Sequence, residues 1–240
     1  MNGMTADSNR IPTVAMAAAA GFGVANLYYN QPMLALMAQS FPFSKIVLLI
    51  PGATQLGYVL GLVAFLPLGD LVDRRKLIVA QFAVLAVTLI GAAVAPTAPL
   101  LLAASVLVGA ACSVAQQIVP FAASLASDDK RGAVVGRVMS GVLCGILLGR
   151  VVAGFVAAWY GWRATFWCAV PAMLAAGALM AATLPTRPPL ETIRYPKALA
   201  SLADLWEEEP VLRRAALTQG ALFGSFSVFW TVLSLHLQEP

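Results

Sequence analysis

Residues 134–158 read VVGRVMSGVLCGILLGRVVAGFVAA, an apolar run long enough to cross a bilayer as a helix. Arg150 lies deep inside this run, and no carboxylate occurs within a dozen residues on either side. A permanent cation in an apolar helix is costly, so such a residue is a candidate for a substrate pathway or a binding site. The role of Arg150 therefore depends on what surrounds this run.

Six further stretches are apolar over a similar length. They cover residues 13–37, 46–68, 77–95, 99–124, 164–184 and 215–237. The chain is 60% hydrophobic and only 11% charged, and every acidic residue lies outside the seven stretches. Because lipid offers the backbone no hydrogen-bond partners, runs of this length and composition must be helical. We therefore predict an all-α integral protein of the lipid bilayer.

The basic residues predict the orientation of the chain. The N-terminal tail and the loops after the second, fourth and sixth stretches carry twelve of them, whereas the opposite side carries Lys45 and Arg163. Positively charged loops stay in the cytoplasm, so we expect a cytoplasmic N-terminus and a seventh span that ends outside. The net charge of +4 then reflects topology and anionic lipid, and we expect no nucleic-acid partner.

The chain divides into four parts. Residues 1–12 form a cytoplasmic tail, 13–184 a bundle of six spans, 185–213 a proline-rich polar linker with an amphipathic turn, and 214–240 a seventh span. A single span after a six-span unit predicts the beginning of a second unit. We therefore expect an incomplete chain.

A weak internal repeat relates the two halves of the six-span bundle. Asn30 and Gln31 precede Pro32 in the first span, and Gln116 and Gln117 precede Pro120 in the fourth. These pairs lie at similar depths along helices that run in opposite directions. The pattern predicts a 3+3 inverted repeat, and polar, proline-interrupted helices at matching positions point to a transport site.

Enzymatic chemistry is not expected. The sequence shows no nucleophile–base pair, metal-ligand cluster or phosphate loop. Cys112, Cys144 and Cys168 lie within spans and are interpreted as packing residues. We predict neither a metal site nor a cofactor. The spans also lack a carboxylate, so a proton as coupling ion requires an acid elsewhere or an indirect role for Asp73 and Arg150.

Polar side chains within the spans are candidates for a substrate cavity. Two interpretations stay open for them, because amides deep in a span either bond another helix or line a cavity. The candidates are Asn26, Tyr29 and Asn30 in the first span, Gln55 and Tyr58 in the second, and Gln116 and Gln117 in the fourth.

Three interpretations of Arg150 compete. It faces a cavity and attracts an anionic or polar substrate, or it is held by amides and carbonyls of the first or fourth span, or it reaches outward to the interface. The preceding glycines Gly141, Gly145 and Gly149 recur every four residues and form one stripe. Such a stripe lets helices approach closely, so we assign it to packing.

The loop after the second span carries the most specific motif, GDLVDRRK over residues 69–76. With Gly69, Leu71, Asp73 and Arg74 in their places, it resembles the signature of the major facilitator superfamily. Further marks are Arg131-Gly132 with Gly136, and Gly161-Trp162-Arg163 with Phe166. Together with NLYYNQP over residues 26–32, they resemble a bacterial subgroup related to drug and sugar efflux permeases.

The resemblance implies a secondary transporter in the bacterial inner membrane, in which two six-span halves rock around a cavity. It also implies that the 69–76 loop takes part in conformational change. Two departures weaken the label of drug antiporter. Ser105 stands where many relatives carry Arg, and Ile146 and Arg150 stand where antiporters commonly carry Pro and Gly.

The sequence thus predicts part of a secondary transporter that exports a small molecule. The alternative is a membrane protein that inserts but does not transport.

Overall fold

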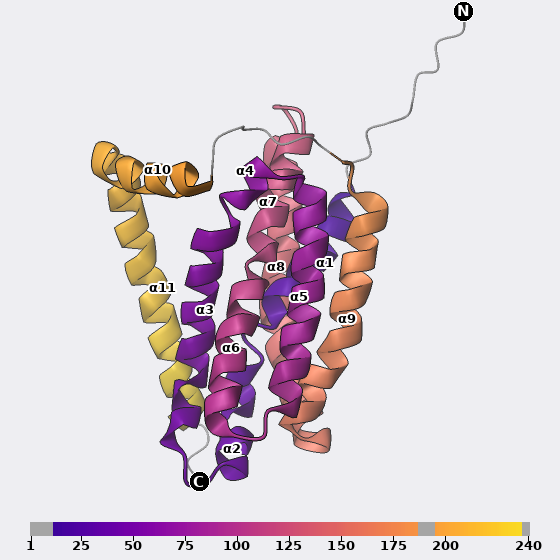
Figure 1. Cartoon of the computed structure of the whole chain (residues 1–240), viewed down its shortest axis with the longest axis vertical. Helices are drawn as coiled ribbons and strands as arrows, with labels where there is room; N and C mark the ends of the chain where they lie inside the picture. The colour runs from indigo at the N-terminus through magenta and orange to yellow at the C-terminus, as the bar shows by residue number, and fades with distance from the viewer. Residues whose placement is uncertain (1–11, 187–194, 237–240) are drawn as a thin grey trace, which may run out of the picture.

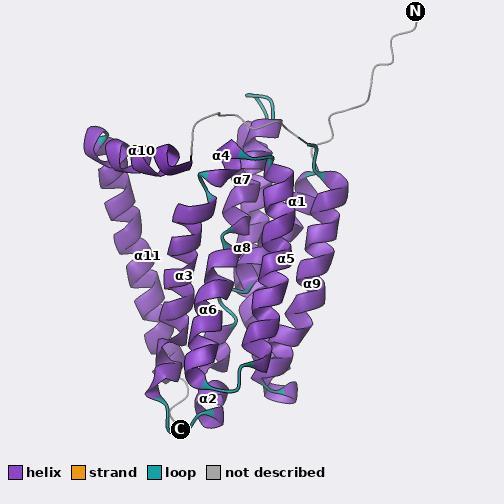
Figure 2. Cartoon of the chain, in the orientation of Figure 1, coloured by secondary structure: helices purple, strands orange, loops and turns teal. Residues whose placement is uncertain are grey.

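The computed structural model describes residues 12–186 and 195–236, and within these ranges the chain forms helices and no strand. The helices stand side by side in a bundle, and α10 lies across one end of it (Figures 1 and 2). Arg10 in the tail and Arg187 and Arg194 in the linker lie outside the described residues.

The helices are numbered along the chain. They are α1 (Thr13–Ala25), α2 (Asn30–Ser40), a short 3₁₀ helix η1 (Lys45–Leu49), α3 (Ile50–Phe65), α4 (Leu68–Leu71), α5 (Arg74–Val94), α6 (Ala98–Cys112), α7 (Val114–Leu125), α8 (Arg131–Tyr160), α9 (Trp162–Thr183), α10 (Tyr195–Glu208) and α11 (Pro210–His236).

Five helical stretches of the described chain are long and apolar enough to cross a membrane. They are Lys45–Leu71, Arg74–Val94, Ala98–Leu125, Arg131–Tyr160 and Trp162–Thr183. These stretches coincide with the predicted second to sixth spans. The predicted first span is divided into α1 and α2, and the predicted seventh span corresponds to α11, which is not among the five. The all-helical class is confirmed, and a count of seven spans stays a prediction.

Three helix pairs make the most extensive contacts, namely α1 with α8, α3 with α6, and α5 with α9. The first and second pairs approach through glycines. A Cβ atom at Gly57 or Gly61 of α3 would collide with the main chain of α6, and one at Gly141 or Gly145 of α8 would collide with that of α1. Such close approach suits helices in lipid, where packing replaces the hydrophobic effect.

The α5–α9 pair is tied at both ends by arginines. Arg75, the second residue of α5, donates to the carbonyl of Ala181 in the last turn of α9 and to the Thr186 hydroxyl at 3.0 Å. Arg163, the second residue of α9, donates to the carbonyl of Ala95 at the end of α5, at 3.0 Å. Cations at helix C-termini satisfy carbonyls that have no partner within the helix.

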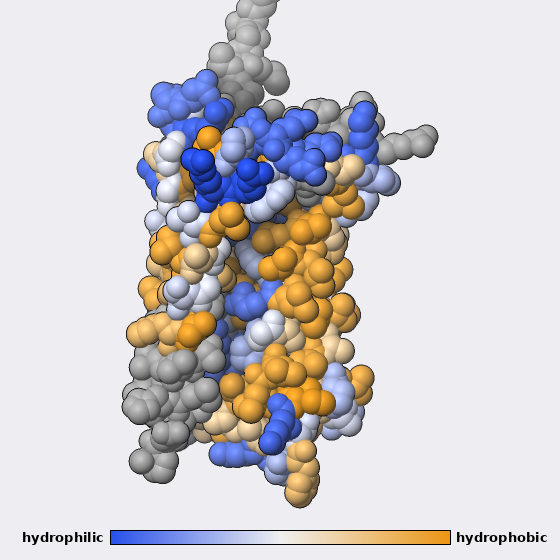
Figure 3. All heavy atoms as spheres, turned by 90° about the vertical axis from the view of Figure 1, so that its left-hand side faces the viewer, coloured by the Kyte–Doolittle hydropathy of each residue, from blue (hydrophilic) through white to orange (hydrophobic). Residues whose placement is uncertain are grey.

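Large apolar side chains cover the outside of the bundle. Leu56, Val59 and Val63 are exposed on α3, and Leu147 and Val151 are exposed on α8. On the face shown in Figure 3, hydrophobic side chains cover most of the middle of the molecule, a narrow hydrophilic strip lies between them, and hydrophilic side chains gather mainly at one end. This distribution suits a helix bundle surrounded by lipid.

Candidate functional site

The predicted first span is interrupted at residues 26–29. There the main chain tightens, because the amides of Leu27 and Tyr28 bond the carbonyls of Val24 and Ala25, three residues back, at 3.1 and 3.0 Å. Pro32 has no N–H for the carbonyl of Tyr28, four residues before it. The interruption therefore follows from the sequence.

The predicted fourth span is also interrupted. Ser113 separates α6 from α7, and its amide bonds the carbonyl of Ala110, three residues back, at 3.3 Å. Pro120 lies inside α7. Polar side chains gather around both interruptions.

Asn26 and Asn30 contact different helices, although they are one turn apart in sequence. The Asn26 amide donates to the Phe22 carbonyl at 2.7 Å and lies 3.3 Å from the Met173 sulfur of α9. The Asn30 amide donates to the Thr54 hydroxyl of α3 at 2.6 Å. Both asparagines are buried. The 3₁₀ turns between them separate two side chains that a regular helix would place on one face.

Tyr29 lines a cavity of about 500 Å³ between α1 and α8. Its ring packs beside Gly149, and the rest of the lining is almost entirely apolar. Gly141 and Gly145 line the same cavity. The glycine stripe thus contacts α1 and also forms the floor of a groove.

The remaining amide candidates separate into two places. Gln116 bonds the hydroxyl of Tyr58, and both side chains are partly buried, as is that of Gln55. Gln117 is buried and donates to the carbonyl of Phe65 at the end of α3. Adjacent residues of a helix point about 100° apart, so Gln116 and Gln117 do not share a site.

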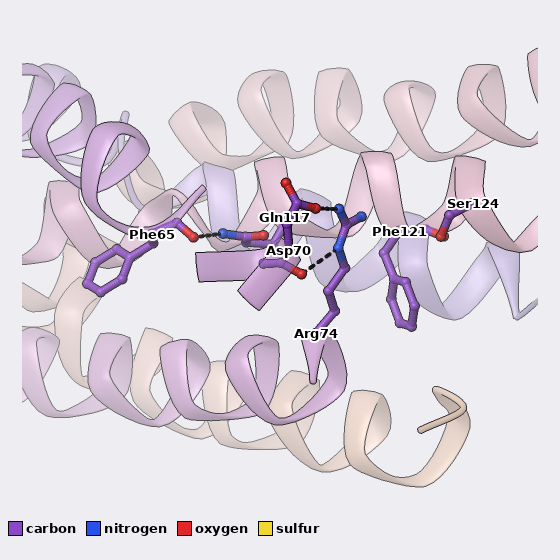
Figure 4. A network of polar contacts seen from close by, with 7 residues as sticks. Phe65, Asp70, Arg74, Gln117, Phe121 and Ser124 are labelled. Atoms are coloured by element: carbon purple, nitrogen blue, oxygen red, sulfur yellow. Dashed lines mark hydrogen bonds and ion pairs between the residues drawn. The ribbon is translucent and has the colours of Figure 1, made fainter. Parts of the chain in front are cut away.

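Gln117 belongs with the 69–76 loop. Gly69 packs directly against its side chain, so a Cβ atom there would collide with the Gln117 amide oxygen. Arg74 donates to the Gly69 carbonyl at 2.8 Å and pairs with Asp70 (Figure 4). Asp73 caps α5 by accepting from the amide of Arg75 at 3.0 Å, and Leu71 ends α4.

The loop between α7 and α8 lies outside the spans and is held by local contacts. Arg131 pairs with Asp128 at 2.8 Å. A hydrogen bond from the Ser127 side chain lowers the pKa of the neighbouring Asp129 carboxyl. This loop carries charge but holds no residue of the polar interior.

Arg150 projects from α8 toward the interruption of the first span. Its Nε donates to the amide oxygen of Gln31 at 3.1 Å. The guanidinium carbon lies 4.5 Å from the centre of the Tyr28 ring and 5.8 Å from that of the Phe226 ring of α11. Cations over aromatic faces are stabilised by the ring quadrupole. The side chain is half-buried and faces protein on these sides.

The candidate cavity residues predicted from the sequence leave out several residues of this site. Tyr28, Phe226 and Gln31, which was named only as part of the repeat, surround Arg150, and Thr54 and Met173 meet the two asparagines. Gln31 and Tyr28 sit within the polar NLYYNQP segment, which was the available signal. Thr54, Met173 and Phe226 come from other helices, and no local pattern marks them.

Comparisons with known proteins identify relatives over nearly the whole chain. A model described as Major Facilitator Superfamily matches residues 13–239. The chain is 39% identical over 228 residues to "Putative uncharacterized transporter YgaY" of Escherichia coli (strain K12), covering 95% of this chain and 58% of that protein. It is 33% identical over 230 residues to "Probable transporter SCO4007" of Streptomyces coelicolor, covering 95% and 53%. The chain thus spans a little over half the length of these relatives.

A further relative and two solved structures complete the comparison. Over 130 residues the chain is 32% identical to a "D-xylose transporter" of Levilactobacillus brevis, covering 52% of this chain and 28% of that one. The fold resembles the partially occluded inward-open xylose transporter XylE from E. coli, with a TM-score of 0.65, 17% identity, and coverage of 96% and 60%. It also resembles a peptide transporter in complex with alafosfalin, with a TM-score of 0.63, 15% identity, and coverage of 85% and 46%.

Proposed function

We propose a transport function on one premise: this chain belongs to the Major Facilitator Superfamily. The chain acts as the substrate-binding six-span unit of a secondary transporter that exports a small molecule. This transporter lies in the bacterial inner membrane, and the N-terminus of the chain lies in the cytoplasm. The two curated relatives that it matches over most of its length are described as transporters. The export direction rests on the resemblance of its motifs to efflux permeases.

The observation that carries the proposal is the pair of interrupted spans. The interruptions at 26–29 and at Ser113 bring polar side chains into the middle of a bundle that is otherwise apolar. Helices broken at matching positions of two repeats are where secondary transporters bind their substrates. The candidate cavity residues Asn26, Tyr29, Asn30 and Gln116 all lie within a turn of these interruptions.

Arg150 is the proposed substrate-binding cation. Gln31 holds its Nε and Tyr28 supports its guanidinium face, so the side chain is positioned before a ligand arrives. A planar guanidinium recognises carboxylates and other anionic or strongly polar groups. We therefore propose a small organic anion, or a polar molecule with acceptor groups, as the substrate class.

The 69–76 loop is the proposed conformational element. Gln117 ties α7 to the end of α3, while Arg74 ties the first turn of α5 to Gly69 and Asp70. Rocking of the bundle would have to break or re-form these contacts. A proton-coupled cycle would need an acid elsewhere or an indirect role for Asp73 and Arg150, and Asp73 caps α5 beside this network.

A sugar is the second substrate candidate. About half of this chain is similar to a protein described as a D-xylose transporter, and this similarity favours a sugar as the substrate. Buried amides such as Asn26 and Asn30 suit the hydroxyl groups of a sugar, because they can donate and accept.

A binding screen separates these candidates. The purified chain in lipid nanodiscs is heated with a panel of organic anions, sugars and lipophilic cations, and its unfolding midpoint is followed. We expect one class to stabilise the chain, with the effect lost in Arg150→Leu and reduced in Arg150→Lys if the substrate is anionic. Stabilisation that persists fully in Arg150→Leu would assign Arg150 to structure and favour the sugar. If no panel compound stabilises the chain, and a full-length counterpart in proteoliposomes moves none of them, the alternative of a non-transporting membrane protein holds.

A further inference from the structure

The linker helix α10 has two faces of different chemistry. Successive residues of a helix point about 100° apart, so Tyr195, Leu199 and Trp206 fall within about 40° of one another on one face. The opposite face carries charged side chains, namely Lys197, Asp204 and Glu208. The helix is therefore amphipathic, and its apolar face requires a surface to cover it.

The bundle covers only the beginning of this apolar face. The Tyr195 hydroxyl donates to the carbonyl of Ala64 at 2.9 Å, and Tyr195 and Leu199 are half-buried. Ala64 lies in the last turn of α3, where carbonyls have no partner within the helix. Farther along α10, Leu205 and Trp206 are 44% and 45% exposed. The described chain thus leaves the second half of the apolar face open.

The bond of Tyr195 shows which way the apolar face points. Ala64 belongs to the stretch Lys45–Leu71, which is long and apolar enough to cross a membrane. Tyr195 reaches from α10 to this stretch, and Trp206 lies on the same face of α10 as Tyr195. The apolar face is therefore turned toward the spans, and the charged face is turned away from them.

The position of α10 determines what its apolar face meets. The helix lies across the direction of the spans at one end of the bundle (Figure 1). After Glu209, α11 starts at Pro210, runs back along the bundle and contacts α2. A helix that connects the ends of two such helices lies at the level where lipid meets water. The surface opposite its open face is therefore the boundary of the bilayer.

The side chains of α10 suit this boundary. Tryptophan and tyrosine are enriched where membrane meets water, because their rings are apolar and their tips are polar. The charged side chains Lys197, Asp204 and Glu208 are exposed and point away from the spans, so they stay hydrated. Two of these three are acidic, so attraction to anionic headgroups does not hold the helix. Burial of apolar area remains as the binding force.

We propose that α10 is an interfacial helix that binds the bilayer leaflet on the side of the 69–76 loop, through Leu199, Leu205 and Trp206. Helices of this kind sink their apolar face about 5–10 Å into the boundary between headgroups and acyl chains. Through the bond from Tyr195 to Ala64, the lipid-bound helix also anchors the end of α3 that leads into the loop. The segment is thus a membrane anchor as well as a linker. This inference does not depend on the proposed transport function.

The test measures quenching of Trp206 fluorescence in the whole chain in nanodiscs. The chain has five tryptophans, so the emission of Trp206 is obtained by subtracting that of Trp206→Phe. One quencher is a phosphatidylcholine brominated near the headgroup end of its acyl chains, and the other is aqueous acrylamide. We expect the bromolipid to remove most of the Trp206 emission and acrylamide to remove little of it. Raising the salt concentration should leave both results unchanged, because charge does not hold the helix.

A tryptophan on the opposite face is the matched control. Asp204→Trp in the Trp206→Phe background places the same fluorophore two residues away on the charged face. Both positions are exposed, so these changes do not disturb the packing of the described bundle. We expect the reverse pattern there, with strong quenching by acrylamide and weak quenching by the bromolipid.

A second variant tests the binding force. Leu205→Glu places a charge on the apolar face and should move Trp206 toward water, so that acrylamide quenches it several times more strongly. Leu205→Met keeps the apolar surface and should leave the quenching as it is.

Three outcomes overturn the proposal. If acrylamide quenches Trp206 as strongly as the tryptophan at position 204, the helix lies in water. If Trp206 is protected from both quenchers, a protein surface such as a second copy of the chain covers the face. Equal quenching by acrylamide in Leu205→Glu and Leu205→Met excludes apolar burial as the force that holds α10.

Discussion

The α1–α8 and α3–α6 pairs meet the same packing demand and differ in the charge of the residue that follows the second of two matched glycines. In both pairs, glycines bring one helix against the main chain of the other. Gly57 and Gly61 of α3 lie 88 residues before Gly145 and Gly149 of α8. After Gly61 comes Leu62, and after Gly149 comes Arg150.

This difference separates the packing role from the chemical role. Since the α3–α6 pair packs closely with a leucine at the matched position, close packing does not require an arginine. The cation is an addition to one side of the bundle, and it is the side that contacts the interrupted first span. The pairing of helices is also the one expected of an inverted repeat, in which the second span meets the fourth and the first meets the fifth.

The largest expected effect comes from filling the glycine contacts. Gly57→Leu and Gly145→Leu should both prevent assembly of the bundle, because the new side chains would have to displace backbone, and overpacking of this kind costs about 3 kcal/mol or more. The yield of monodisperse protein in detergent measures how well each variant assembles. Gly91→Leu is the matched control, since nothing lies within 4 Å of a Cβ atom there. A well-folded Gly145→Leu variant beside a misfolded Gly57→Leu variant would break the equivalence of the two pairs.

Arg150→Leu makes the α1–α8 pair resemble the α3–α6 pair. We expect membrane insertion and folding to be preserved, while binding of an anionic substrate weakens by about 2–4 kcal/mol through loss of a charge-assisted contact. Export by a full-length counterpart carrying the same change should fall accordingly. Leu62→Ala is the control on the matched side and should leave transport near its normal rate. Unchanged transport by Arg150→Leu would mean that Arg150, like Leu62, contributes only to packing.

Removing the hydroxyl partners of Asn30 and Gln81 compares how much the polar contacts at the two interruptions contribute to stability. Thr54→Val leaves the Asn30 nitrogen without its partner, and Ser113→Ala does the same to Gln81. Interhelical bonds in membranes contribute about 0.6 kcal/mol on average and up to ~1.7 kcal/mol. Chemical or steric-trap unfolding of each variant should therefore show a small loss, greater for the shorter Asn30 bond. Equal and large losses would mean that both hydroxyls have further roles.

The smallest effects are expected at the two arginine caps of the α5–α9 pair. Arg75→Ala should loosen the last turn of α9, and Arg163→Ala the last turn of α5, each by about 0.3–1 kcal/mol. Hydrogen exchange read at single-residue resolution measures this, because the faster exchange should appear at opposite ends of the pair. Faster exchange at the same end in both variants would contradict reciprocal capping.

The apolar spans could be predicted from the sequence because hydrophobicity and length determine what lipid accepts. The second to sixth predicted spans coincide with apolar helical stretches to within a few residues, although the fourth is divided at Ser113. Which neighbouring helix each polar side chain contacts was harder to predict. Asn26 and Asn30 separate because two 3₁₀ bonds rotate the chain between them, and a change of helical phase cannot be read from spacing.

The partners of the candidate residues depend on contacts across the bundle. Gln117 meets the carbonyl of Phe65, which is 52 positions away, and Arg150 meets Gln31 across 119 positions. No local pattern carries such information. The loop motif at Gly69 and Arg74 was recognisable because it resembles a family signature, and its residues contact one another within five positions.

Arg75 and Arg163 connect α5 and α9 at both ends of the pair. Two helices tied at both ends resist sliding and rotation relative to each other, so we expect the pair to move as a rigid body. In the proposed transport cycle, we therefore expect deformation to concentrate where the bundle lacks such ties. The turn at 26–29 and the junction at Ser113 interrupt their spans and carry buried polar side chains, so we expect the bundle to bend there first.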